Sequence, residues 1–161
     1  MTILTVWCFA ELDGARRAER ELAALSELGL VVVDDASLVF WPRTAVLPQT
    51  RGAGNIVHSS PLAPTYWGLL YGLAFAAPML EDADTQPRGL HEVGIDGPVI
   101  TRLRQGLRPG SSGLLAVMDA PIAPEHCLLL SACGAGTKSF DVRLSDEQTA
   151  NLHRVFGSER R

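Results

Sequence analysis

The feature that most constrains this fold is an uncharged apolar segment, residues 62–80, near the middle of the 161-residue chain. Its most apolar part, Tyr66 to Leu80, has 15 residues. An α-helix of that length is about 22 Å long, whereas the hydrocarbon core of a bilayer is about 30 Å thick. We therefore expect a helix over residues 64–80 that is too short to cross a membrane and must cover its apolar surface in another way.

The position of this helix in the chain leads to the same expectation. The strands before and after it are predicted to belong to one sheet, and a single crossing would place them on opposite sides of a membrane. Two other environments stay open for the helix. It can pack against protein, either its own sheet or a second copy of the chain, or it can lie shallowly at a membrane surface, where Trp67 and Tyr71 suit the headgroup zone. We expect protein to be its main cover.

Hydrophobic periodicity on either side of the segment predicts two strand–helix–strand units. The first runs through a strand at 3–9, a helix at 14–28 and extended chain at 30–41. The second runs through a strand at 113–118, a short helix at 124–132 and a strand at 139–144. Further helices are predicted after Asp96 and after Ser145.

This split βαβ order is typical of the ferredoxin-like sandwich, an α+β fold. We predict a single ferredoxin-like domain over residues 1–161, with residues 43–92 as an insertion between the second and third strands that contains the apolar helix 64–80. Helices then cover one face of the sheet, and the other face needs cover from the insertion, the last helix or a second subunit.

Local signals predict where several helices begin and end. Asp13 is placed to cap the first helix, and Gly29 to close it with a positive φ. Ser145 and Gln148 have the spacing of a capping box. The stretch 30–41 reads either as one long strand with a polar middle or as a tight hairpin.

Small residues recur every four positions along the apolar helix, at Gly68, Gly72 and Ala76. Such a repeat lines up on one side of a helix and lets another helix approach closely. We therefore predict an oligomer or membrane interface on this helix, formed by Tyr66, Trp67, Gly68, Leu69, Tyr71, Gly72, Leu73, Phe75 and Ala76. Trp7 and Trp41 are candidates to line a ligand cleft between paired sheets.

Composition excludes some classes of partner. The chain is 47% hydrophobic and 20% charged, with a formal net charge of −4, so it lacks the basic footprint of a nucleic-acid-binding protein. The three cysteines, Cys8, Cys127 and Cys133, match no common zinc spacing. The first residues carry no basic leader, so we expect no signal peptide and a cytoplasmic location, with attachment to the inner membrane surface as the alternative.

Candidates for chemistry are few. Asp34, Asp35 and Asp119 lie near predicted strand ends, where a buried carboxylate can act as an acid or base. His126 and Cys127 are neighbours, but adjacent residues on a helix point about 100° apart, which is poor geometry for a nucleophile and its base. We predict no catalytic residue, no cofactor and no metal site.

Several short motifs resemble, in order, a bacterial family without an assigned function, the domain of unknown function twelve sixty-nine. They are Leu4-Thr5-Val6-Trp7, Val39-Phe40-Trp41-Pro42, Tyr66-Trp67-Gly68-Leu69-Leu70-Tyr71-Gly72-Leu73, Val93-Gly94-Ile95-Asp96 and Leu144-Ser145-Asp146-Glu147-Gln148. The resemblance implies a ferredoxin-like fold interrupted by a glycine-rich apolar hairpin, in proteins usually labelled as membrane proteins, and it brings no reaction or cofactor. Where the second half of that hairpin would lie, this chain has an acidic run that begins at Glu81.

These observations predict a non-enzymatic, self-associating protein with an assembly or scaffold role, whose partner is itself, with a membrane surface as a second one and no nucleic acid. The alternative is a small-ligand sensor that uses a cleft between paired sheets. A third hypothesis is an enzyme that uses Asp34, Asp35 or His126 in such a cleft.

Overall fold

The computed structural model describes residues 2–53, 64–76, 97–134 and 137–156. Its elements follow the chain in this order: β1 (Thr2–Phe9), α1 (Gly14–Glu27), β2 (Val33–Phe40), β3 (Gln49–Gly52), α2 (Pro64–Tyr71), the π-helical segment η1 (Gly72–Ala76), α3 (Gly97–Gly106), β4 (Ser112–Met118), α4 (Pro124–Ser131), β5 (Lys138–Leu144) and α5 (Asp146–Phe156). The protein is therefore of the α+β class, as the sequence predicts.

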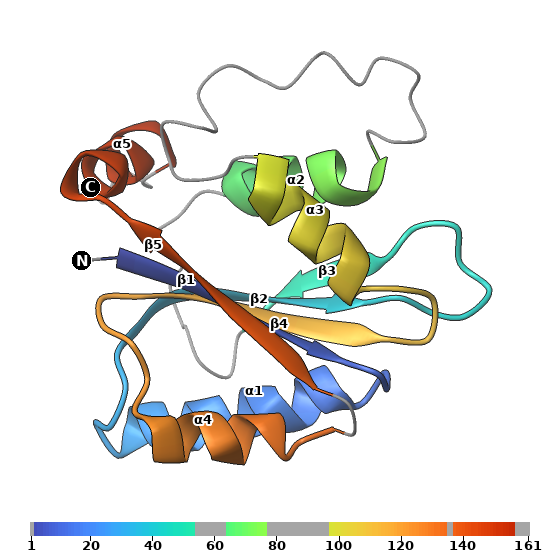
Figure 1. The fold of residues 1–161 in the computed structure, drawn as a ribbon, viewed down its shortest axis with the longest axis horizontal. Helices are drawn as coiled ribbons and strands as arrows, with labels where there is room; N and C mark the ends of the chain where they lie inside the picture. Colours follow the sequence, from blue (N-terminus) through green and yellow to red (C-terminus); the bar gives the residue numbers. More distant parts are fainter. Residues whose placement is uncertain (1, 54–63, 77–96, 135–136, 157–161) are drawn as a thin grey trace.

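The strands form one five-stranded sheet with the order β3-β2-β4-β1-β5, and every neighbouring pair is antiparallel. The central strands β1 and β4 are buried along their whole length. Both have the β-branched or apolar residues expected of strands that are covered on both faces. Figure 1 shows the sheet between two helical layers, with α1 and α4 on one side and α2, α3 and α5 on the other.

Each face of the sheet has its own apolar core. The α1–α4 face is built around Trp7, Phe9, Leu22, Leu38 and Leu114. The opposite face is covered by α2, η1, α3 and α5, through a cluster that includes Trp67, Leu70, Tyr71, Ala74, Phe75, Ile100, Leu103 and Leu152. The apolar helix thus packs on its own sheet, which agrees with the expectation of a protein cover.

Several predicted boundaries need correction. Asp13 makes no side-chain capping bond, and the Ala15 N–H instead donates to the Ser112 hydroxyl at 3.0 Å. The sequence pattern extends the helix to Leu28, but α1 ends at Glu27 and Leu28 is 73% exposed. Both differences arise at the ends of α1, where contacts from other elements decide the geometry. Gly29 does close the helix with φ of 73°.

The stretch 30–41 contains one strand and not a hairpin. β2 begins only at Val33, and its register with β4 shifts between Val33 and Asp35. The Asp35 carboxylate accepts a hydrogen bond from the Ala36 N–H at 2.8 Å, which explains how the polar middle fits into a sheet.

The strand β3 lies inside residues 43–92, the predicted insertion, where the sequence predicts no strand. Its four residues are all exposed, so no apolar alternation marks them. The capping box of α5 is confirmed, since the Ser145 N–H donates to Gln148 Oε1 at 2.9 Å and the Gln148 N–H donates to the Ser145 hydroxyl at 3.1 Å.

Candidate functional site

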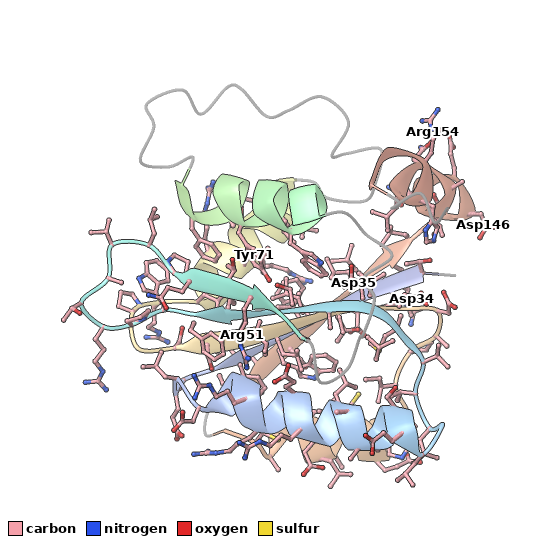
Figure 2. All side chains as sticks on the ribbon, turned by 180° about the vertical axis from the view of Figure 1, so that it is seen from behind. Asp34, Asp35, Arg51, Tyr71, Asp146 and Arg154 are labelled. Atoms are coloured by element: carbon pink, nitrogen blue, oxygen red, sulfur yellow. The ribbon has the colours of Figure 1, made fainter. Side chains whose placement is uncertain are left out.

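A groove of about 210 Å³ lies between the β2–β3 hairpin and the helix α2 with its continuation η1. We call it the hairpin groove; its lining residues are Leu47, Pro48, Thr50, Gly68, Tyr71, Gly72 and Phe75. Figure 2 shows α2 above β3, with Tyr71 between the helix layer and the sheet. Four of these residues belong to the interface predicted from the sequence.

Two lining residues of the groove, Tyr71 and Phe75, belong to an aromatic row on α2 and η1 that also includes Trp67. Trp67 and Tyr71 stack with ring centroids 6.2 Å apart, and Tyr71 and Phe75 stack at 6.5 Å. Trp41, which follows β2, meets Phe75 edge-on at 5.5 Å. The four-residue spacing brings the three helical rings to one side of the helix, where they are buried against the sheet.

The glycines of this helix open the groove. Gly68 is exposed and Gly72 is half-buried. A Cβ atom added at either position would meet no atom within 4 Å. The side predicted to receive a close-packed helix is therefore not occupied by any element in the described part of the chain.

The helix changes its winding at the groove. The α-helical turns end at Tyr71, and residues Gly72–Ala76 form a π-helical turn. A π-helical turn has i→i+5 bonds, and Tyr71 and Phe75, which are four residues apart, still stack where this turn begins. The Arg104 Nε donates to the Ala74 carbonyl at 2.7 Å, which ties this turn to α3. π-helical turns occur often at functional sites.

The groove suits binding more than proton transfer. None of its lining residues carries a charge at neutral pH, and its polar side-chain groups are the hydroxyls of Thr50 and Tyr71. Such a lining favours an apolar group over an ion.

The remaining predicted interface residues are only partly placed. Trp67 is buried against the sheet. The structure describes only the backbone of four others, which belong to α2 and η1: Tyr66, Leu69, Leu73 and Ala76. Residues 77–80 of the expected helix lie outside the described residues.

The two tryptophans proposed for a ligand cleft are not brought together. Trp7 is 1% exposed and belongs to the core on the α1–α4 face. Trp41 packs against the core on the opposite face. Side chains alternate between the two faces along a strand, and the face that each ring takes depends on how the strands pair. The sequence by itself does not give that pairing.

The acidic residues singled out in the sequence do meet, at the end of β2 opposite to the groove. Burial raises the pKa of Asp34 to about 7, and a hydrogen bond and charge repulsion from Asp119 add to the shift, with a smaller contribution from Asp35. Asp119 is exposed. The Asp34 and Asp119 carboxyl groups thus lie within hydrogen-bonding distance of each other. In the part of the chain that the structure describes, no group of three or more His, Cys, Asp or Glu is arranged to hold a metal ion.

The pKa values of all three cysteine thiols are raised, with burial as the main cause. Burial raises the pKa of the Cys8 thiol to about 11 and also raises the pKa of Cys127, with repulsion from Asp141 as the second cause. A raised pKa keeps a thiol protonated and unreactive. All three cysteines are free thiols.

Comparison with known proteins gives no identification: no family model, no curated protein and no solved structure matches this chain. Within residues 2–53, 64–76, 97–134 and 137–156, no helix combines the length and the apolar character that a membrane crossing requires.

The sequence reasoning missed the hairpin side of the groove. Leu47, Pro48 and Thr50 lie in the predicted insertion, where no strand is predicted, and only the pairing of β3 with β2 places this segment beside α2. The sequence signal for a strand here is the β-branched residue Thr50, since β-branched residues are enriched in strands.

Proposed function

We propose that this protein is a non-enzymatic binding module that takes an apolar group of another molecule into the hairpin groove. The observation that carries the proposal is the open space at Gly68 and Gly72, beside the ring of Tyr71. A helix that only had to pack on its own sheet would not need two glycines on the side away from the core, where each costs about 0.5–1 kcal/mol of helix stability relative to alanine.

The expected affinity of a single apolar group is low. Full burial of one leucine or phenylalanine side chain contributes about 1.5–3 kcal/mol, which alone corresponds to binding in the millimolar range or weaker. Tests of the groove therefore need millimolar probes and a method that reports the position of binding.

Nuclear magnetic resonance with p-cresol and isobutyramide as probes meets both needs. We expect millimolar probe to shift the amide signals of Thr50, Gly68 and Gly72. Gly72→Leu should fill the groove and abolish the shifts. Gly97→Leu is the matched control, because a side chain at Gly97 also meets no atom within 4 Å, but in α3.

Two outcomes would refute the binding function. One is the absence of any shift at these amides, and the other is an unchanged response in Gly72→Leu. Equal loss in both leucine variants would also count against the groove, because it would show a general effect of the substitution.

A second candidate function is self-association with an assembly role. It is supported by two exposed apolar side chains at the tip of the β2–β3 hairpin, Val46 at 69% and Leu47 at 42% exposure. Light scattering should then give a mass that is a multiple of 17.3 kDa, and Val46→Lys should return it to the single-chain value. A single-chain mass for the unaltered protein would exclude this candidate.

For the fold, we propose a ferredoxin-like domain in which β3, α2 and η1 are an insertion. The support is the antiparallel order β2-β4-β1-β5, with α1 between β1 and β2 and α4 between β4 and β5. From the shared motifs we also propose membership of the family of unknown function that the chain resembles. We further propose a cytoplasmic location, with attachment to the inner membrane surface as the alternative.

A further inference from the structure

The strand β3 ends the sheet on the side of the hairpin groove. It pairs with β2 through Val39↔Thr50 and its neighbouring pairs, and no described strand pairs with its other edge. An edge strand presents main-chain donors and acceptors that another chain can use.

The register identifies which groups of β3 face outward. The Ala53 N–H donates to the Ala36 carbonyl at 3.2 Å, so this opposite pair is a hydrogen-bonded one. Hydrogen-bonded and non-hydrogen-bonded pairs alternate in an antiparallel ladder. The Arg51 main chain therefore faces β2, in agreement with its carbonyl accepting from the Ser37 hydroxyl at 3.2 Å. The main-chain N–H and C=O groups of Thr50 and Gly52 face the outer edge.

The hairpin groove adjoins these outward-facing groups. The Thr50 side chain lines the groove while its main chain faces the edge. A residue added opposite Thr50 in an antiparallel strand would point its side chain to the same face of the sheet, and so into the groove.

The size of the groove favours a side chain over a whole small molecule. Pockets for drug-sized ligands and cofactors have volumes of about 300–1,000 Å³. The hairpin groove, at about 210 Å³, is smaller and holds one large side chain with room to spare.

We propose that the occupant is an extended peptide segment of a partner protein, which adds to β3 as an antiparallel strand and places one large apolar side chain opposite Thr50 in the hairpin groove. This inference rests on the binding function proposed above. Main-chain bonds to Thr50 and Gly52 supply affinity in this mode of recognition, and the groove supplies specificity.

A second copy of the chain does not satisfy the same site through its own β3. Self-pairing centred on Arg51 would place Gly52 opposite Thr50, and self-pairing centred on Thr50 would place a second Thr50 there. Neither residue brings a large apolar side chain into the groove.

The test uses a fluorescein-labelled, capped heptapeptide in which threonines flank a central leucine. Fluorescence polarisation with the full chain should show saturable binding. Thr50→Pro should weaken it at least tenfold, because proline removes the outward N–H, and a proline with this orientation is tolerated in an edge strand. Thr50→Val keeps the N–H and the shape of the side chain, and we expect it to bind within about twofold of the unaltered chain.

Variants of the peptide make the same test without altering the protein. Replacing the central leucine with alanine should weaken binding at least tenfold, because the groove is left empty. Methylation of the main-chain nitrogen of that leucine should do so as well, because it removes the donor to the Thr50 carbonyl. The methylated peptide tests strand addition even if the Thr50→Pro variant does not fold.

The outcomes separate the two proposals. If p-cresol shifts the groove amides but the heptapeptide does not bind, the peptide assignment is wrong and the binding function stands. Strand addition is also overturned if Thr50→Pro and the methylated peptide bind as well as their controls. If neither p-cresol nor the peptide binds, both proposals fail.

Discussion

On the α1–α4 face of the sheet, helices and strands approach so closely that a Cβ atom added at Gly14 would lie 2.4 Å from the Phe9 Cβ. On the opposite face, the glycines of α2 and η1 have open space around them. Gly14 thus permits close packing of α1 against Phe9, whereas Gly68 and Gly72 leave a groove. The same residue type therefore marks close packing on one face and an open groove on the other.

The largest expected effects test whether both faces belong to one cooperative core. Leu22 of α1 and Leu70 of α2 are both 0% exposed, on opposite faces. Leu22→Ala and Leu70→Ala should each lower the free energy of unfolding by about 2–5 kcal/mol, because each leaves a cavity. Urea unfolding measures both. Leu128→Ala, at a side chain that is 71% exposed, is the control and should change stability by less than about 0.5 kcal/mol. An effect of Leu70→Ala as small as that of the control would mean that α2 does not belong to the core.

The close approach at Gly14 gives the next largest effect. Gly14→Ala should destabilise the protein by about 1–3 kcal/mol, because the added methyl group overlaps the Phe9 side chain. Thermal unfolding provides the measurement. A gain in stability, as expected for alanine in an unobstructed helix, would contradict the close packing of this face.

The next prediction concerns a titratable group in the sheet, the carboxyl group of Asp34 in β2. Burial raises the pKa of Asp34 to about 7 in the folded protein, against 3.8 for an aspartate in its ordinary state, so between these values the folded state binds more protons than the unfolded state. Stability should therefore fall as pH rises from about 4 to about 8. Because Asp34 is only half-buried, solvent screening reduces the effect to the order of 1 kcal/mol.

Asp34→Asn should raise stability at pH 8 and flatten this pH dependence, as urea unfolding at several pH values would show. Asp13→Asn, at an exposed carboxylate, is the control and should leave the slope unchanged. A slope that persists in Asp34→Asn would assign the titration to another group.

The smallest expected effect concerns the open side of α2. Gly68→Ala should stabilise the protein by about 0.5–1 kcal/mol, because alanine favours the helix and meets no atom at this position. A comparison of thermal midpoints with Gly14→Ala sharpens the contrast between the faces, since the same substitution should have opposite signs. A loss of stability at Gly68 would mean that the groove is filled in solution.

Prediction from the sequence succeeded where one element carries its own signal. Ala15, Ala18, Leu22 and Leu25 repeat with helical spacing and are all buried. The capping box at Ser145 and the positive φ at Gly29 follow from local chemistry in the same way. These features need no knowledge of what packs against them.

Prediction failed where a partner far away in the sequence decides the outcome. The Ala15 N–H is satisfied by Ser112 and not by the nearby Asp13, and β3 exists because β2 pairs with it. The groove has the same origin, since its two walls come from the hairpin and from α2.

The order of apolar and polar residues by itself determined the α+β class, the main helices and strands, and the presence of an apolar helix without charge, because periodicity and capping act within a few residues. Tertiary structure alone decided that α2 and η1 pack on their own sheet and that Trp7 and Trp41 lie on opposite faces. It also decided that Gly68 and Gly72 line one groove with Thr50 of β3, a strand whose outer edge pairs with no described strand. Those facts depend on sheet register and on which layer covers which face, and contacts between distant segments set both.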